Sequence, residues 1–89
     1  MEAKRLLIGG RVQGVGYRDW MVAEAQRLGV IGWVRNQADG SVQALVDGPN
    51  AAVEELLRAC RRGPRMASVT RIDEEWTDPP EEPDFIRRV

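Results

Sequence analysis

The chain carries the same pattern twice within 89 residues: an apolar strand, an amphipathic helix and a second strand. The two copies meet at Asp39-Gly40, a dipeptide typical of the tight turn in a β-hairpin. A chain of this length is expected to form one domain, because it has too few residues for two hydrophobic cores. The pattern therefore predicts the element order β-α-β-β-α-β in a single domain over residues 1–89.

We expect strands at 5–8, 31–36, 41–47 and 67–76, helices at 19–28 and 49–62, and a short terminal strand at 85–86. The spacing of Cys60 from the apolar residues of the second helix places it toward the core. Val69 and Ile72 differ in parity, which predicts a β-bulge or burial on both faces of their strand. The simplest packing of these elements is an α+β two-layer sandwich, ferredoxin-like, with one antiparallel sheet and both helices on one face. Many unrelated functions share this fold, so it does not indicate a function by itself.

The sequence contains no histidine. Because histidine is the usual general base near neutral pH and a common metal ligand, a Ser-His-Asp triad, a Cys-His pair and a His-rich metal site are excluded. The single cysteine cannot form an internal disulfide, which agrees with a reducing compartment. No stretch resembles a signal peptide or a membrane-spanning helix. We therefore expect a cytoplasmic protein with no membrane partner.

The net charge of −1 hides an uneven distribution. Residues 1–71 carry eleven basic and seven acidic side chains, whereas residues 73–84 carry seven acidic side chains and no basic one. The first part favours anionic ligands. The acidic segment 73–84 is interpreted as a solvated, solubilising stretch.

A glycine-bearing loop with the sequence GRVQGVGYR spans residues 10–18 and leads from the first strand into the first helix. Its glycines permit positive φ angles, and backbone N–H groups at a helix N-terminus can bind an anion. Arg18 adds a planar guanidinium suited to phosphate oxygens. The loop has neither the G-K-[ST] of a Walker loop nor the G-x-G-x-x-G of a dinucleotide site. It is predicted to bind an oxyanion, and the alternative is a glycine-rich turn that only permits tight packing.

The string from Gly10 to Arg18 closely resembles the signature of the acylphosphatase family. Further matching segments are Gly32-Trp33-Val34-Arg35-Asn36, Gly40-Ser41-Val42, Gly48, Gly63-Pro64 and Ala67-x-Val69. The resemblance implies an enzyme that hydrolyses the carboxyl–phosphate bond of acyl phosphates to a carboxylate and inorganic phosphate. It also implies a ferredoxin-like fold and the use of no metal and no cofactor.

By motif position, the resemblance implies that Arg18 binds the phosphate and that Asn36 orients the attacking water. The implied phosphate cradle consists of the backbone N–H groups of Gln13, Gly14, Val15, Gly16, Tyr17 and Arg18. A site without histidine suits this substrate, because a weakly basic carboxylate leaves without a general acid and a neutral amide can hold the water. Tyr17 stands where phenylalanine is commoner in the family and is expected to keep its packing role.

The neighbouring side chains have simpler interpretations. Asp19 is read as a first-turn carboxylate favoured by the helix dipole. Trp33 is read as a core residue, and Arg35 as a solvated side chain on the sheet face opposite Asn36. Trp20 lies on the shoulder of its helix, and whether it borders the substrate site is left open.

Two non-catalytic alternatives compete with the enzyme. The first is an anion-binding or acyl-phosphate-binding module of the same fold, such as a domain of a larger carbamoyl-transfer maturation protein. The second is an RNA-recognition domain, which needs aromatic residues on the two central strands. Residues 5–9 and 41–47 have none, so no nucleic-acid partner is expected. We expect a monomer that accepts a broad range of small acyl phosphates.

Overall fold

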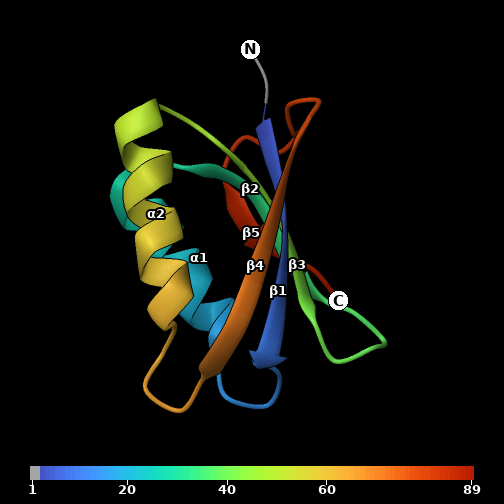
Figure 1. Ribbon diagram of the computed structural model, residues 1–89. Helices are drawn as coiled ribbons and strands as arrows, with labels where there is room; N and C mark the ends of the chain where they lie inside the picture. The colour runs from blue at the N-terminus through green and yellow to red at the C-terminus, as the bar shows by residue number, and fades with distance from the viewer. Residues whose placement is uncertain (1–2) are drawn as a thin grey trace.

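A computed structural model describes residues 3–89. The elements are β1 (Ala3–Arg11), α1 (Tyr17–Leu28), β2 (Ile31–Asn36), β3 (Val42–Asp47), α2 (Asn50–Arg62), β4 (Ser68–Thr77) and β5 (Phe85–Arg87). Both helices cover the same face of one sheet and leave the other face open (Figure 1). This arrangement confirms the predicted element order and the two-layer α+β sandwich.

The five strands lie in the order β4-β1-β3-β2-β5. Neighbours among the first four strands are antiparallel, as predicted. The terminal strand β5 instead pairs in parallel with β2, with Phe85 opposite Gly32, so the sheet as a whole is mixed. The cause is the connection after β4, which crosses the upper end of the sheet in Figure 1 and starts β5 in the direction of β2.

The pairing of β1 with β4 contains the predicted bulge. Gly9 lies opposite Arg71 and Gly10 opposite Val69, so Thr70 is an extra residue on β4. One extra residue reverses the alternation of side chains along the rest of the strand. Val69 and Ile72 therefore both pack against the core despite their different parity.

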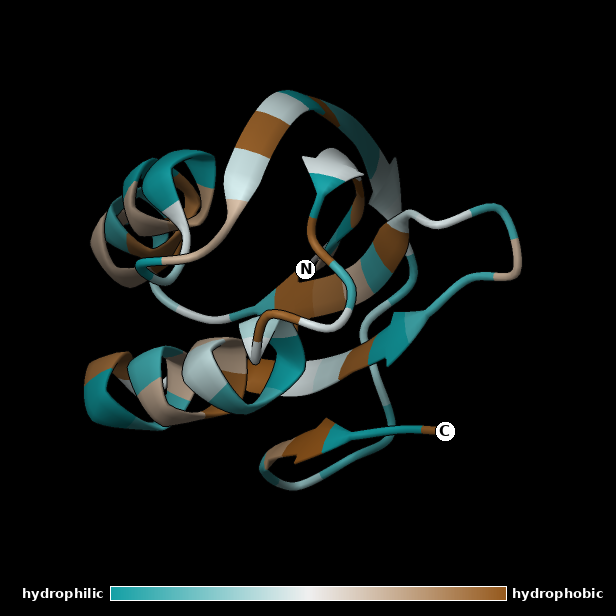
Figure 2. Cartoon of the chain, turned by 90° about the horizontal axis from the view of Figure 1, so that it is seen from below, coloured by the Kyte–Doolittle hydropathy of each residue, from teal (hydrophilic) through white to brown (hydrophobic). Residues whose placement is uncertain are grey.

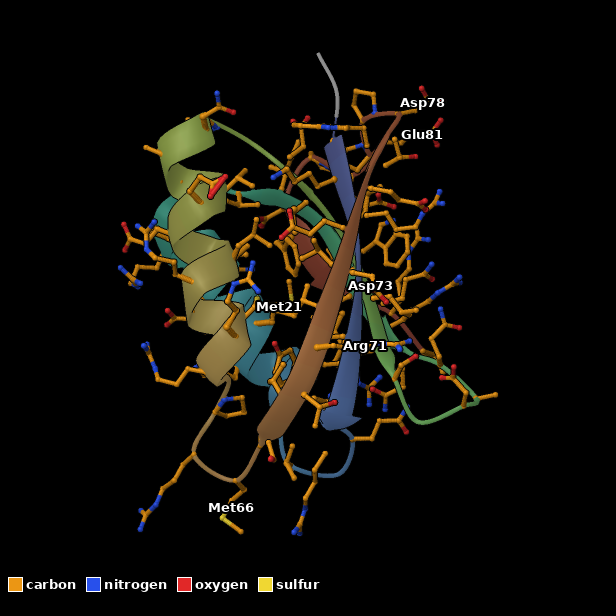
Figure 3. All side chains as sticks on the ribbon, in the orientation of Figure 1. Met21, Met66, Arg71, Asp73, Asp78 and Glu81 are labelled. Carbon is orange, nitrogen blue, oxygen red and sulfur yellow. The ribbon has the colours of Figure 1, made fainter. Side chains whose placement is uncertain are left out.

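The core fills the space between the helices and the sheet. Its fully buried members include Leu6, Ile8, Met21, Val34, Val42, Leu56 and Cys60. Figure 3 shows Met21 between the two layers, whereas Arg71 and Asp73 of β4 point away from the helices. The prediction that Cys60 faces the core is confirmed, and burial raises the pKa of its thiol to about 12.

Trp33 does not belong to this core. Val34 occupies the buried position on β2, so the alternation of the strand sends Trp33 and Arg35 to the open face. The ring of Trp33 is half-buried there, with the guanidinium carbons of Arg35 and Arg88 each 5.1 Å from its centroid. The prediction of Trp33 as a core residue was therefore wrong. Arg35 has the predicted face, but its Nε donates to Gln43 Oε1 at 2.8 Å instead of pointing freely into solvent.

The acidic segment is also less free than its sequence indicates. Glu74 accepts from Lys4 at 3.1 Å and from Arg61 at 3.2 Å, and Glu75 accepts from Arg5 at 2.8 Å. Exposed pairs of this kind contribute about 0–1 kcal/mol each. They hold β4 alongside β1 and α2, so these carboxylates balance nearby basic side chains. No helix in residues 3–89 is long and apolar enough to cross a membrane.

Candidate active site

Two connections lie toward one end of the molecule. The loop over residues 12–16 joins β1 to α1, and the turn over residues 37–41 joins β2 to β3. Both lie in the lower half of Figure 1, and Figure 2 views the molecule from this end. The side chains with predicted chemical roles, Arg18 and Asn36, belong to the elements that border these connections.

The loop takes a shape that only glycine adopts without strain. Gly14 has φ 73° and Gly16 has φ 78°, both in the left-handed region. Gly16 is the N-cap residue of α1, and no side chain caps this helix. Within residues 3–89, no N–H group from Gln13 to Arg18 donates to a loop, turn or side-chain acceptor. Several donors therefore meet the positive end of the helix dipole, an arrangement that suits a tetrahedral anion.

The space in front of these glycines is open. A Cβ atom built at Gly14 or Gly16 would meet no other heavy atom within 4 Å. The two residues are therefore needed for their backbone conformation rather than for close packing against the protein.

Arg18 lies in the first turn of α1. Its Nη1 donates to the backbone oxygen of Arg88 at 3.0 Å, and the N–H of Arg88 in turn donates to Val34 O at 2.8 Å. This bond holds the guanidinium against the residues after β5, and these residues run alongside the last part of β2. Since an arginine carries five N–H donors, this single bond leaves enough of them for a bidentate contact with an anion.

Asn36 is the last residue of β2 and pairs with Val42. Its parity matches that of Val34, so its side chain lies on the helix-facing side of the sheet. The contact from Arg18 through Arg88 reaches Val34, two residues before Asn36. The structure thereby brings the two predicted side chains to the same part of the fold.

The side chain of Gln13 makes contacts that the sequence analysis did not predict. Its Nε2 donates to Gln37 O at 2.7 Å and to Ser41 O at 2.9 Å. Only the backbone of Gln13 was assigned a role, because a single polar residue in a loop carries no signal for its partners. This carboxamide connects the loop to the turn that follows Asn36.

Tyr17 anchors the start of α1. Its side chain is 1% exposed, and its hydroxyl donates to the backbone oxygen of Cys60 on α2 at 2.7 Å. Burial is the main reason why the pKa of this phenol is raised. The predicted packing role of Tyr17 is confirmed, and the hydroxyl adds a bond that phenylalanine cannot form.

The remaining neighbours have structural surroundings. Asp19 lies in the first turn of α1, as predicted, and Arg87 donates to it at 3.0 Å. Trp20 packs against the edge of the core, with its ring 5.3 Å from that of Tyr17.

Among residues 3–89, no group of three or more His, Cys, Asp or Glu side chains could hold a metal ion. A cavity of about 330 Å³ lies at the opposite end of the sheet, where Lys4, Asp47, Glu54 and Trp76 contribute to its wall. Gly14 and Gly16 in the loop are exposed to solvent.

Comparison with known proteins gives a consistent answer. The acylphosphatase family model matches residues 4–86. A curated acylphosphatase from Acidiphilium cryptum is 62% identical over 89 residues, 100% of this chain and 98% of that protein. The crystal structure of acylphosphatase from Bacillus subtilis has a TM-score of 0.93 at 33% identity and covers 100% of both chains. The crystal structure of T. kodakarensis HypF has a TM-score of 0.85 at 27% identity, over 100% of this chain and 12% of that one.

Proposed function

This chain belongs to the acylphosphatase family, and we propose that it hydrolyses the carboxyl–phosphate bond of acyl phosphates by in-line attack of a water molecule. Its activity is that of an acylphosphatase, a hydrolase acting on phosphorus-containing acid anhydrides. In the proposed reaction, water attacks phosphorus as the bond to the carboxylate oxygen breaks. The products are a carboxylate and inorganic phosphate, and the water proton passes to solvent.

One observation carries this mechanism: within residues 3–89, the backbone N–H groups of residues 13–18, where α1 begins, donate to no loop, turn or side-chain acceptor. The transferring phosphoryl group has three equatorial oxygens whose negative charge must be stabilised. We assign these oxygens to the backbone N–H groups of Gln13, Gly14, Val15, Gly16, Tyr17 and Arg18, together with the guanidinium of Arg18. These donors are held in place before the reaction, so they stabilise charge with little rearrangement.

Asn36 is assigned to the attacking water. Its carboxamide can both donate and accept, so it can orient a water molecule without taking its proton. A carboxylate leaving group is weakly basic and departs without protonation, which removes the need for a general acid. The absence of histidine from the sequence therefore agrees with a labile mixed anhydride better than with a stable phosphate monoester.

We further propose a cytoplasmic monomer that requires no metal and accepts a broad range of small acyl phosphates. The breadth follows from the exposed position of Gly14 and Gly16 in the loop. Metal independence predicts that a chelator leaves the hydrolysis of benzoyl phosphate unchanged. Activity lost to a chelator and restored by a divalent ion would contradict it.

The assignment of roles is tested by kcat and by the inhibition constant for inorganic phosphate. Arg18→Ala should weaken phosphate binding and slow turnover, and Arg18→Lys should restore little because an ammonium cannot form the bidentate contact. Asn36→Ala should lower kcat by about 10²-fold while phosphate affinity stays near that of the wild type. If Asn36→Ala instead lost phosphate affinity and kept its turnover, the two roles would be reversed.

A non-catalytic anion-binding module is the alternative. The similarity to HypF concerns a small part of a longer chain. Such a module would bind phosphate through the same loop and would show no turnover. Hydrolysis of benzoyl phosphate that is strongly slowed by Asn36→Ala therefore separates the two functions.

A further inference from the structure

The carboxamide of Gln13 forms a short connection between the two halves of the site. Both of its acceptors, Gln37 O and Ser41 O, are backbone carbonyls, at 2.7 and 2.9 Å. A carbonyl cannot donate, so the side-chain NH2 must face both of them. The glutamine therefore uses both of its N–H donors on one partner, the turn that follows Asn36.

That turn has a well-defined shape of its own. Gln37 N donates to Ser41 O at 2.8 Å, and Gly40 N donates to Gln37 O at 3.2 Å. The carboxylate of Asp39 accepts from both the N–H and the hydroxyl of Ser41, at 3.0 and 2.6 Å. The two carbonyls that receive Gln13 thus belong to a closed unit that starts directly after Asn36.

We infer that the Gln13 side chain is a positioning residue, which sets the distance between the phosphate cradle and the water held by Asn36. This inference rests on the proposed function, because it assumes that Asn36 acts on the water. Gln13 itself lies in the cradle, and its carboxamide fixes the cradle to the end of β2. A displacement of about 1 Å between reacting groups can lower a rate about 10²-fold.

Gln13→Glu is the sharpest test, since it keeps the length and shape of the side chain. The ionised carboxylate cannot donate and repels both carbonyl oxygens, whereas the protonated acid can donate one hydrogen bond. At neutral pH we expect kcat to fall by about 10–100-fold. The inhibition constant for phosphate should rise as well, because the new negative charge lies beside the cradle. Relative to the wild type, kcat should recover in part as the pH is lowered and the glutamate gains a proton.

Two further variants control for structural damage. Gln13→Met has similar length but no donor and no charge, so it should lose kcat without pH-dependent recovery. Its inhibition constant for phosphate should change less than about threefold. Gln26→Glu makes the same exchange at a glutamine whose Nε2 donates to the backbone oxygen of Phe85 at 3.3 Å, away from the loop. It should keep the kcat of the wild type. Circular dichroism and thermal melts check that each variant folds.

The double variant Gln13→Met/Asn36→Ala decides how Gln13 acts. If Gln13 works through Asn36, the double variant should be no slower than Asn36→Ala alone. Multiplied losses, or a loss of phosphate affinity in Gln13→Met as large as its loss of kcat, would overturn the positioning role and leave the proposed mechanism intact. An Asn36→Ala variant with full turnover would overturn the mechanism and the inference together.

Discussion

The hydroxyl of Tyr17 offers a test of how the start of α1 is held. It donates to the backbone oxygen of Cys60 at 2.7 Å in a buried position. In a regular helix this oxygen would accept from the N–H four residues later, but residue 64 is a proline and has no N–H. Tyr17 therefore supplies the donor that the sequence of α2 cannot provide.

Tyr17→Phe should consequently destabilise the protein while leaving its packing almost unchanged. An unsatisfied buried acceptor costs about 1–3 kcal/mol. For a domain of this size, 1 kcal/mol corresponds to about 4–8 °C in Tm. We expect the free energy of unfolding to fall by about 1–2 kcal/mol and Tm by roughly 5–15 °C. The ring still fills its place, so kcat at room temperature should change less than about twofold.

Urea titration and thermal melts measure the effect. Trp76→Phe is the control, because Trp76 is an aromatic residue that is 63% exposed, and its exchange should change stability by less than about 0.5 kcal/mol. The pH dependence adds a second readout. Because the pKa of Tyr17 is raised in the folded state, its contribution is complete below its ordinary value and is lost at higher pH. The decline above about pH 10 should be weaker in Tyr17→Phe. An unchanged urea midpoint would show that the carbonyl of Cys60 does not need this donor.

The remaining predictions concern Cys60 and the loop. Burial raises the pKa of Cys60 from 9.0 to about 12, so folded protein should resist iodoacetamide near neutral pH and react only after addition of urea; rapid labelling without urea would contradict its burial. The same shift means that the contribution of Cys60 to the free energy of unfolding is complete below pH 9 and is lost as the pH rises toward about 12. Cys60→Ala should therefore lose less stability over this pH range than the wild type. Gly16→Ala and Gly29→Ala each place a methyl group on a residue in the left-handed region, with φ 78° and 77°. Neither methyl group would crowd a neighbouring atom. Each should lose about 1–2 kcal/mol of stability, but only Gly16→Ala should also raise the inhibition constant for phosphate, and an equal rise in Gly29→Ala would show a global effect.

The fold was predictable because its signals are local. Hydrophobic periodicity and the Asp39-Gly40 turn are read within a few residues, and they place β2 at residues 31–36 as observed. The bulge was visible in the parity of Val69 and Ile72. The parallel pairing of β5 was not visible in the sequence, because it depends on the path of the seven residues that connect β4 to β5.

The site was predictable in its residues and only partly in its contacts. Arg18 and Asn36 follow from the resemblance of two motifs, and the structure brings their elements to the same end of the sheet. The carboxamide bonds of Gln13 span 24 and 28 positions. Such bonds depend on how two loops approach each other, which no local pattern encodes.

The position of Trp33 bears on the site through Arg88. As a core residue it would only stabilise the sandwich, but on the open face it lies against the guanidinium of Arg88. The side chain of Arg88 also pairs with Glu82, a member of the acidic segment. Its backbone N–H donates to Val34, and its backbone oxygen accepts from Arg18. Arg88 therefore connects the open face to the helix-bearing side. Because a backbone carbonyl holds Arg18, the packing of Trp33 and the charge of Glu82 contribute to the position of a guanidinium that neither of them touches.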